Sequence, residues 1–191
     1  MFNLTIKVEN GVGRLHNYPF VLHNFKTGKH DVELVLPETW QAKDLFDQLQ
    51  KNLVEFSKWL VWADKIDSVQ KEVDSIKQFQ QKMVDGSAFN LVILVDETPA
   101  GMIDLHDLNS DSGEVGYWLS NDFQHLGIMT ESVEFLKKYA FEQLKLDYLV
   151  LRTHPKNFAS QNVAKRSGFK YQEIDDNGHK KFVLRNNAGR R

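Results

Sequence analysis

The hydrophobic pattern is most informative around residue 114. Residues 114–119 alternate apolar with other positions and are rich in β-branched and aromatic types, which predicts a strand. A polar break at 120–122 follows, and a helix is then predicted whose first turn contains Gln124, Gly127 and Met129. The first amides of a helix lack internal hydrogen-bond partners, and the helix dipole places partial positive charge there. Glycine also lets a ligand approach the backbone closely. The stretch therefore predicts an anion-binding site.

The chain before this stretch is predicted to form strands, then helices, then a hairpin. Turn signals at Asn10–Gly11 and Thr27–Gly28 indicate β structure over residues 1–36. Proline followed by an acidic residue at 37–38 is typical of a helix start, and Ser68 is a typical N-cap. The remaining predictions in this part are a helical piece at 53–62 and paired strands at 89–95 and 100–106.

The chain after this stretch returns to the sheet. Apolar residues at helical spacing follow Gly127 over residues 133–144, so one face of that helix packs on a sheet. Residues 147–153 are almost continuously apolar, which favours a central strand. A short helix at 158–166 and a closing hairpin at 169–184 complete the chain. The order predicts an α/β (α+β type) fold, in which helices flank a mixed, mostly antiparallel sheet.

Composition excludes several classes of function. The 191 residues include no cysteine, which excludes disulfides, a cysteine nucleophile and a thiolate metal site. No run approaches the ~20 apolar residues of a spanning helix, and the N-terminus does not resemble a signal peptide. The net charge of −2 provides no basic surface for nucleic acid. These features predict a cytoplasmic protein that binds neither membranes nor nucleic acid.

The motifs together resemble one family. The segment from Gln124 to Glu131, with Gly127 in its centre, is similar to the Gln-x-x-Gly-x-(Gly/Ala) acetyl-CoA loop of the GNAT N-acetyltransferases. The match extends over roughly residues 31–185 and resembles the ribosomal-protein N-acetyltransferase (RimL-type) branch. The other matching segments are Trp59-Leu60-x-Trp62, Gly116-Tyr117-Trp118-Leu119, Asn157-x-x-Ser160 and Ser167-Gly168-Phe169.

This resemblance implies a GNAT-like fold and a set of cofactor contacts. Residues 31–185 would form the acetyltransferase domain, with 1–30 as a β extension of the same domain and 186–191 as a disordered tail. The backbone of Trp118 and Leu119 would pair with the pantetheine arm of acetyl-CoA, Asn157 would contact that arm, and no metal is implied. The pyrophosphate would bind the amides of Gln124, His125, Leu126, Gly127, Ile128, Met129 and Thr130. Met129 departs from the family, where a smaller residue is usual.

Three residues are candidates for the chemistry of acetyl transfer. Glu114 resembles the family glutamate that accepts a proton from the amine, and an exposed carboxylate at a strand end is its alternative interpretation. His106 is a second candidate base or relay, because histidine titrates near neutral pH. The tyrosine that many family members use to protonate the leaving thiolate is Ala164 here. Ser160 takes the matching place in the RimL-like branch, although a serine there also suits a helix start.

The resemblance implies an acetyl-CoA-dependent N-acetyltransferase whose acceptor is a protein N-terminal α-amine. A small amine such as a polyamine, amino sugar or drug is the alternative acceptor. A catalytically silent acyl-CoA-binding module is the alternative outside the enzymes. The resemblance is also compatible with a homodimer. Trp59 and Trp62 are expected either at the substrate cleft or in plain core or hinge packing.

Overall fold

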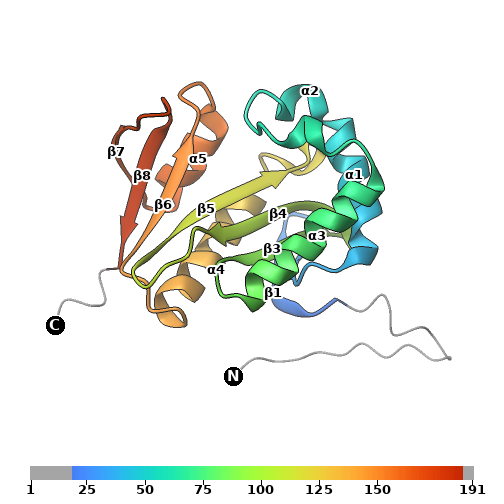
Figure 1. The fold of residues 1–191 in the computed structure, drawn as a ribbon, viewed down its shortest axis with the longest axis horizontal. Coiled ribbons are helices and arrows are strands. Elements are labelled where there is room, and N and C mark those ends of the chain that lie inside the picture. Colours follow the sequence, from blue (N-terminus) through green and yellow to red (C-terminus); the bar gives the residue numbers. More distant parts are fainter. Residues whose placement is uncertain (1–18, 187–191) are drawn as a thin grey trace.

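Within residues 19–186, which the computed structural model describes, eight strands form one sheet in the order β1-β2-β3-β4-β5-β6-β8-β7 (Figure 1). Neighbouring strands are antiparallel except β5 and β6, so the predicted mixed, mostly antiparallel sheet is confirmed. The strands are β1 Val21–Thr27, β2 His30–Val35, β3 Phe89–Val95, β4 Thr98–His106, β5 Ser112–Leu119, β6 Tyr148–Thr153, β7 Lys170–Ile174 and β8 Lys180–Arg185.

Helices cover both faces of the sheet (Figure 1). They are α1 Ala42–Lys51, α2 Leu53–Phe56, α3 Val69–Val84, α4 Ile128–Glu142 and α5 Phe158–Arg166, with short 3₁₀ turns at Thr39–Gln41, Ala63–Lys65 and Asn121–Phe123. The Ser68 hydroxyl caps α3 as predicted and accepts from the amide of Lys71. Of the helices in the described region, none combines the length and apolar character needed to cross a membrane.

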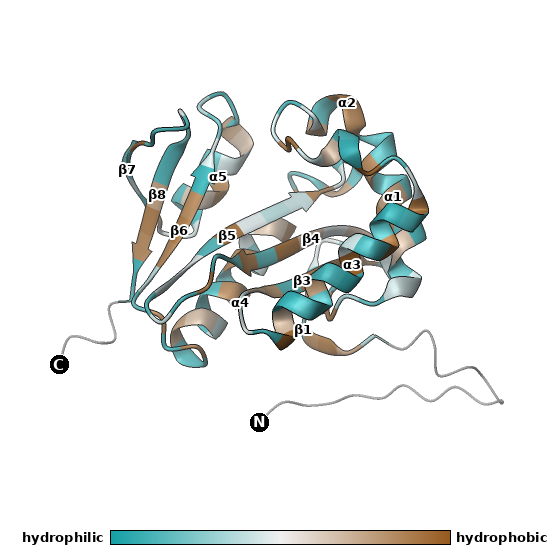
Figure 2. Ribbon diagram, viewed as in Figure 1, coloured by the Kyte–Doolittle hydropathy of each residue, from teal (hydrophilic) through white to brown (hydrophobic). Residues whose placement is uncertain are grey.

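Two hydrophobic clusters pack on opposite faces of the sheet, as the alternation of each strand requires. Ile103 of β4 and Val115 of β5 belong to the cluster that includes α4. Met102 and Trp118, on the other face of the same strands, belong to the cluster that includes α1 and α3. β3 is buried along its whole length, and Figure 2 shows apolar residues gathered on the central strands.

The parallel pair β5–β6 is short. It contains the pairs Ser112↔Tyr148, Gly113↔Leu149 and Glu114↔Val150, and then the two strands diverge (Figure 1). The carboxyl half of β5 stays paired with β4 as far as Leu119. A strand edge with unpaired backbone groups is available to a ligand that can pair with it as an added strand.

The hairpin of β1 and β2 extends the sheet and contacts the loop before α4. β2 pairs with β3, and the Thr27 hydroxyl donates to the Leu126 carbonyl. Residues 21–30 thus pair with the main sheet. Residues 1–18 of the predicted β structure and residues 187–191 of the predicted 186–191 tail lie outside the described residues, while the amide of Asn186 donates to the Asp147 carbonyl.

Glu72 in α3 predicts a pH-dependent stability. Its side chain is buried, and burial raises the pKa of the carboxyl from 4.5 to about 7. The folded chain therefore binds more protons than the unfolded chain between these values, and stability falls as the pH rises through that window. We expect Glu72→Gln to stabilise the protein at pH 8 by up to about 3 kcal/mol.

Chemical denaturation at pH 5 and pH 8 measures this difference. The stabilisation by Glu72→Gln should be smaller at pH 5, where the carboxyl of Glu72 is mostly protonated in the folded state. Asp74→Asn, on the exposed side of the same helix, serves as a control with an expected change within about 0.5 kcal/mol at either pH. An equal effect of Glu72→Gln at both pH values would contradict the prediction.

Candidate active site

The loop before α4 ends in a left-handed glycine. Gly127 is the N-cap of α4 with φ +83°, and a Cβ added there would meet nothing within 4 Å. His125 is also left-handed, with φ +62°. Because such residues break a right-handed helix, α4 begins at Ile128, and the prediction that Gln124 lies in its first turn was wrong. The Gln124 side chain instead donates to the Leu119 carbonyl at 3.0 Å and braces the loop.

The start of α4 has the features of an anion site. The amide of Glu131 is bonded to the Gly127 carbonyl, so the amides of residues 128–130 precede the first internal hydrogen bond of α4. Arg166, from the last turn of α5, donates from Nε to Thr130 Oγ1 at 3.2 Å and brings a positive charge beside these amides. Met129 is buried in the core, so its side chain does not occupy the ligand side of the loop. The loop therefore fits the pyrophosphate of acetyl-CoA.

The free half of β5 lies beside this loop. Trp118 and Leu119 are buried, and past Glu114 the strand is not paired with β6. The Leu119 carbonyl accepts from the Gln124 side chain, so one of the backbone groups predicted to pair with the pantetheine arm is already bonded to the protein. The unpaired edge of β5 runs from Glu114, where β5 and β6 diverge, toward the loop before α4.

Successive side chains of β5 face opposite sides of the sheet, which separates two groups of polar residues. Glu114 and Gly116 share the face of Trp118, which packs with α1 and α3. Tyr117 packs with the opposite cluster, which includes α4 and residues of α5. Polar groups thus lie on both sides of the free edge of β5.

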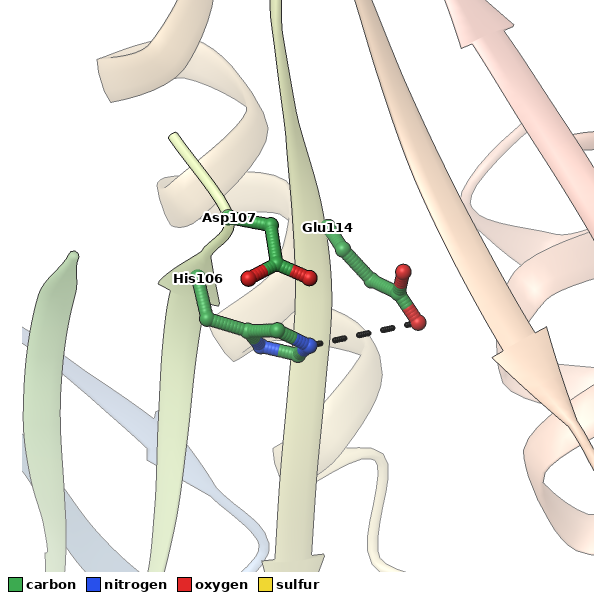
Figure 3. Close-up of side chains that lie close together, drawn as sticks. All are labelled: His106, Asp107 and Glu114. Carbon is green, nitrogen blue, oxygen red and sulfur yellow. Dashed lines mark ion pairs between the residues drawn. The ribbon is translucent and has the colours of Figure 1, made fainter. Parts of the chain in front are cut away.

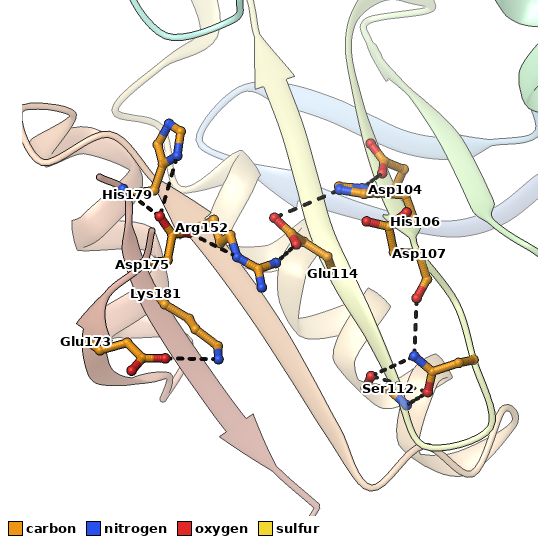
Figure 4. Close-up of polar contacts among 11 residues, drawn as sticks. Asp104, His106, Asp107, Ser112, Glu114, Arg152, Glu173, Asp175, His179 and Lys181 are labelled. Carbon is orange, nitrogen blue, oxygen red and sulfur yellow. Dashed lines mark hydrogen bonds and ion pairs between the residues drawn. The ribbon is translucent and has the colours of Figure 1, made fainter. Parts of the chain in front are cut away.

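A chain of ion pairs crosses the divergence of β5 and β6 (Figure 4). The Arg152 guanidinium on β6 donates to the carboxylate of Glu114 on β5, and Arg152 Nε lies 3.2 Å from Asp175 Oδ2 after β7. Backbone amides of residues 177 and 179 donate to Asp175, and chiefly the bond from His179 lowers the pKa of Asp175. The alternative of an unpartnered, exposed Glu114 is wrong, because its side chain is only 15% exposed and is paired with Arg152.

His106 lies across from Glu114 and is bonded to Asp104. Nδ1 of His106 lies 2.6 Å from Asp104 Oδ1, and Nε2 lies 3.9 Å from Glu114 Oε1 (Figures 3 and 4). The bond to Asp104 is the main cause of a raised His106 pKa; burial opposes it, while the charges of Asp104, Glu114 and Asp107 add to it. A half-buried imidazole with a raised pKa can take up a proton near neutral pH.

His106, Asp107 and Glu114 also lie close enough together to suit a metal ion, with candidate atoms within 4.8 Å of one another (Figure 3). The Arg152 guanidinium already places a positive charge on Glu114. A second cation beside it would be repelled. The charge already paired with Glu114 therefore argues against a metal ion at this group.

Ser160 lies on the opposite face from His106. Its hydroxyl oxygen is 2.9 Å from the Tyr117 hydroxyl, and its amide donates to Asn157 Oδ1, the N-cap of α5. Burial raises the pKa of Tyr117 to about 12, so the phenol keeps its proton at neutral pH. Ser160 is thus part of a hydroxyl pair beside the free edge of β5. Asn157 orients the helix that carries it.

Three ring side chains from separate loops lie close together: Trp59 after α2, His154 after β6 and His179 before β8. The Trp59 ring is 5.3 Å from the His154 ring, which is 6.4 Å from the His179 ring. Trp59 is half-buried and Trp62 is 38% exposed, so neither lies in the core, while a place at the substrate cleft or at a hinge stays a prediction for both. The contact between Trp59 and His154 joins the segment after α2 to the loop after β6.

Sequence reasoning missed the partners of the predicted residues. Asp104 is two residues before His106 and so shares its strand face, which the alternation could have indicated. Arg152 is the one cation in the predicted strand 147–153, and such an exception could also have been noticed. For Tyr117 and Arg166, no local signal identifies the partners Ser160 and Thr130.

Comparison with known proteins identifies the family. A family model described as an acetyltransferase (GNAT) domain matches residues 33–170. A "Putative ribosomal N-acetyltransferase YdaF" of Bacillus subtilis (strain 168) is 29% identical over 147 residues, covering 75% of this chain and 80% of that protein. The "Ribosomal-protein-serine acetyltransferase" of Escherichia coli (strain K12) is 26% identical over 133 residues, covering 67% and 73%.

The fold also matches solved structures. A RimL ribosomal L7/L12 α-N-protein acetyltransferase in complex with coenzyme A superposes with a TM-score of 0.76 at 20% identity, covering 85% of this chain and 98% of that one. At this identity the likeness concerns the fold. The family model spans well over half of the chain and includes the loop, both diverging strands and α5. The chain therefore belongs to the GNAT family and is an acetyl-CoA-dependent N-acetyltransferase.

Proposed function

We propose that the chain acetylates the α-amine of a protein N-terminus, with a ribosomal protein as the acceptor, by direct attack of the amine on bound acetyl-CoA. The observation that carries this proposal is that β5 and β6 diverge beside two sets of polar side chains. His106 and Glu114 lie on one face of the sheet there, and Ser160 lies on the other. The names of the two bacterial relatives support the acceptor class.

The residues that would bind acetyl-CoA come from the start of α4, from α5 and from the free edge of β5. The amides at the start of α4 and the Arg166 guanidinium would bind the pyrophosphate, and Gly127 leaves the space open. The free edge of β5 near Trp118 would pair with the pantetheine arm, with Asn157 near it. Acetyl-CoA, when bound, supplies an activated acetyl group as a thioester.

The residues on the two faces would handle the protons. Glu114, or His106 through a water molecule, would accept the proton that the attacking amine loses. Backbone amides of the free half of β5 would polarise the carbonyl, and Ser160 would give a hydrogen bond to the leaving sulfur. An α-amine has a reference pKa of roughly 7.7–8.0, so part of it is already neutral at physiological pH and only modest base assistance is required.

Release of free CoA tests the function directly. Short peptides that begin with Ser or Ala would be compared with the same peptides carrying a blocked N-terminus and an internal lysine, and with spermidine. We expect CoA release, and an added acetyl group by mass spectrometry, only with the free N-termini. Release with spermidine alone would assign a small-amine acceptor. Acetyl-CoA binding without any release would assign a silent module.

Ser160→Ala is expected to lower kcat about 100-fold without weakening acetyl-CoA binding. The variant removes the hydroxyl that would assist the leaving thiolate, a contribution typical of general acid catalysis. Steady-state kinetics and calorimetric titration of acetyl-CoA measure the two effects separately.

Ser75→Ala is the matched control, because the Ser75 hydroxyl bonds a carbonyl of its own helix α3. It should leave kcat unchanged. An unchanged kcat in Ser160→Ala would remove Ser160 from the mechanism. A loss of affinity with normal kcat would instead make it a binding residue.

A further inference from the structure

Asp104 and His106 form a hydrogen-bonded pair, and a glycine on the neighbouring strand leaves room for their side chains. They lie two residues apart on β4, so both side chains point to the face that packs with α1 and α3. Gly116 on β5 lies opposite Asp104 in the register. A Cβ at Gly116 would come within 2.9 Å of Asp104 Oδ2 and 3.1 Å of His106 Cε1. A larger residue at this strand position would thus displace the pair.

The geometry of the pair decides which nitrogen of His106 is free. An ionised carboxylate only accepts hydrogen bonds, so the 2.6 Å contact requires a proton on Nδ1. In the neutral ring, Nε2 then carries the lone pair, and this atom points toward Glu114 (Figure 3). The 3.9 Å between Nε2 and Glu114 Oε1 exceeds a hydrogen bond, so no bond from a protonated Nε2 to that carboxylate competes with this tautomer.

Glu114 is held differently. Arg152 donates to one of its oxygens, and Asp175 pairs with Arg152 from the other side (Figure 4). This charge-assisted bond is strong, and it holds the Glu114 carboxylate in place with one of its oxygens occupied. His106, by contrast, presents an available lone pair next to the divergence of β5 and β6.

We propose that His106 Nε2 accepts the proton of the acceptor amine and that Asp104 is the positioning residue that holds His106 in the required tautomer. This inference rests on the proposed function and assigns its base. The proton passes from the amine nitrogen to Nε2 as the new N–C bond forms and the C–S bond breaks. The imidazolium is stabilised by the carboxylates of Asp104 and Glu114, and it returns the proton to solvent. The thiolate takes up one proton from solvent, so the amine loses one proton, CoA gains one, and the reaction is balanced.

The charges around His106 come from several elements. Asp104 and His106 lie on β4, Asp107 follows it, and Glu114 faces the ring from β5. Arg152 on β6 pairs with Glu114, and no charged contact from α1 or α3 to His106 occurs within the described residues. Because the bond to Asp104 is the largest cause of the raised His106 pKa, removal of that carboxylate should lower it.

The first test needs no enzymatic activity. Long-range ¹H–¹⁵N correlation spectra of the whole chain, recorded over a pH series, report the tautomer and titration of each histidine. In the wild type we expect His106 to be protonated on Nδ1 when neutral. In Asp104→Asn we expect the amide to donate to Nδ1, so that the proton moves to Nε2 and His106 titrates at lower pH.

A second histidine–carboxylate pair provides the matched control. His30 Nδ1 lies 2.6 Å from Asp96 Oδ2, near the turns between β1 and β2 and between β3 and β4. Asp96→Asn should change the His30 signals and leave His106 and the catalytic rate unchanged. A wild-type His106 protonated on Nε2 would overturn the inference.

The second test links the pair to catalysis. The pH profile of kcat/KM would be measured for wild type, Asp104→Asn and Asp96→Asn with the amine that the CoA-release assay identifies. The ratio of variant to wild type cancels the titration of the amine itself. We expect Asp104→Asn to lower the plateau about 10- to 100-fold and to move the acidic limb to lower pH, because a weaker base stays neutral further into acid.

The outcomes separate this inference from the proposed function. A lowered plateau with an unmoved acidic limb would show that Asp104 is structural only and would overturn the proposed base. Normal kinetics in Asp104→Asn would do the same while leaving the acetyltransferase function intact. If the wild type acetylates no amine at all, the function fails, whatever tautomer the spectra show.

Discussion

Replacing Gly127 by glutamate is expected to lower the affinity for acetyl-CoA by about a thousandfold. The substitution places a negative charge at the start of α4, where the amides of residues 128–130 would otherwise meet the pyrophosphate. Two like charges about 4 Å apart near a protein surface repel by roughly 4 kcal/mol, which corresponds to about three orders of magnitude in affinity. Calorimetric titration of acetyl-CoA into both proteins measures the effect.

Two further variants separate charge from backbone strain. Gly127 has φ +83°, so Gly127→Ala carries the strain of a left-handed residue without the charge, and a Cβ there meets nothing within 4 Å. We expect it to weaken binding less than tenfold. Gly86→Glu puts the same residue at another left-handed glycine, φ +71°, after α3, and should bind normally. Unchanged affinity in a folded Gly127→Glu would refute the loop as the pyrophosphate site.

Gly101→Ala is expected to destabilise the fold by about 3 kcal/mol. A Cβ at Gly101 on β4 would lie 2.3 Å from the Trp118 carbonyl oxygen and 2.9 Å from the Leu119 Cα. Both atoms are backbone, so no side-chain rotation relieves the clash, and β4 and β5 must separate. The β3–β4 register shifts next to this glycine, and Gly101 pairs with Leu119 in the half of β5 that carries the free edge.

Thermal unfolding measures this prediction, and a melting temperature lower by about 10 °C is expected for a chain of this size. Gly178→Ala serves as the control, because Gly178 has φ +78° and a Cβ there would meet nothing within 4 Å. It should cost only the left-handed strain of about 1 kcal/mol. A loss in Gly101→Ala no larger than that in Gly178→Ala would contradict the prediction that the contact with Trp118 makes glycine necessary at position 101.

The local predictions that succeeded rest on short-range physics. The strand predicted at residues 114–119 is the carboxyl part of β5, and the loop with Gly127 precedes a helix as expected. Ser68 caps α3, and the residues predicted for 89–95 form β3. In each case a repeat of two or 3.6 residues, or one capping residue, is sufficient.

The start of α4 was misplaced for a similar local reason. The motif from Gln124 onward contains good helix-compatible residues, but His125 and Gly127 both adopt positive φ. Positive φ is uncommon outside glycine, although histidine adopts it more often than most residues, and the loop that contains His125 is also held by long-range contacts. Those contacts come from distant parts of the chain, because Thr27 on β1 donates to Leu126 and Lys51 on α1 pairs with Asp122.

The sequence alone determined the class of fold, the loop and the identity of Glu114, His106 and Ser160 as candidates. Only the tertiary structure decided what these side chains touch. Alternation along a strand shows which face a residue shares, but the register between strands selects its neighbour. Arg152 reaches Glu114 because β5 and β6 pair for three residues and then diverge, although the two residues are 38 positions apart. Long-range pairing of this kind leaves no periodic trace in the sequence.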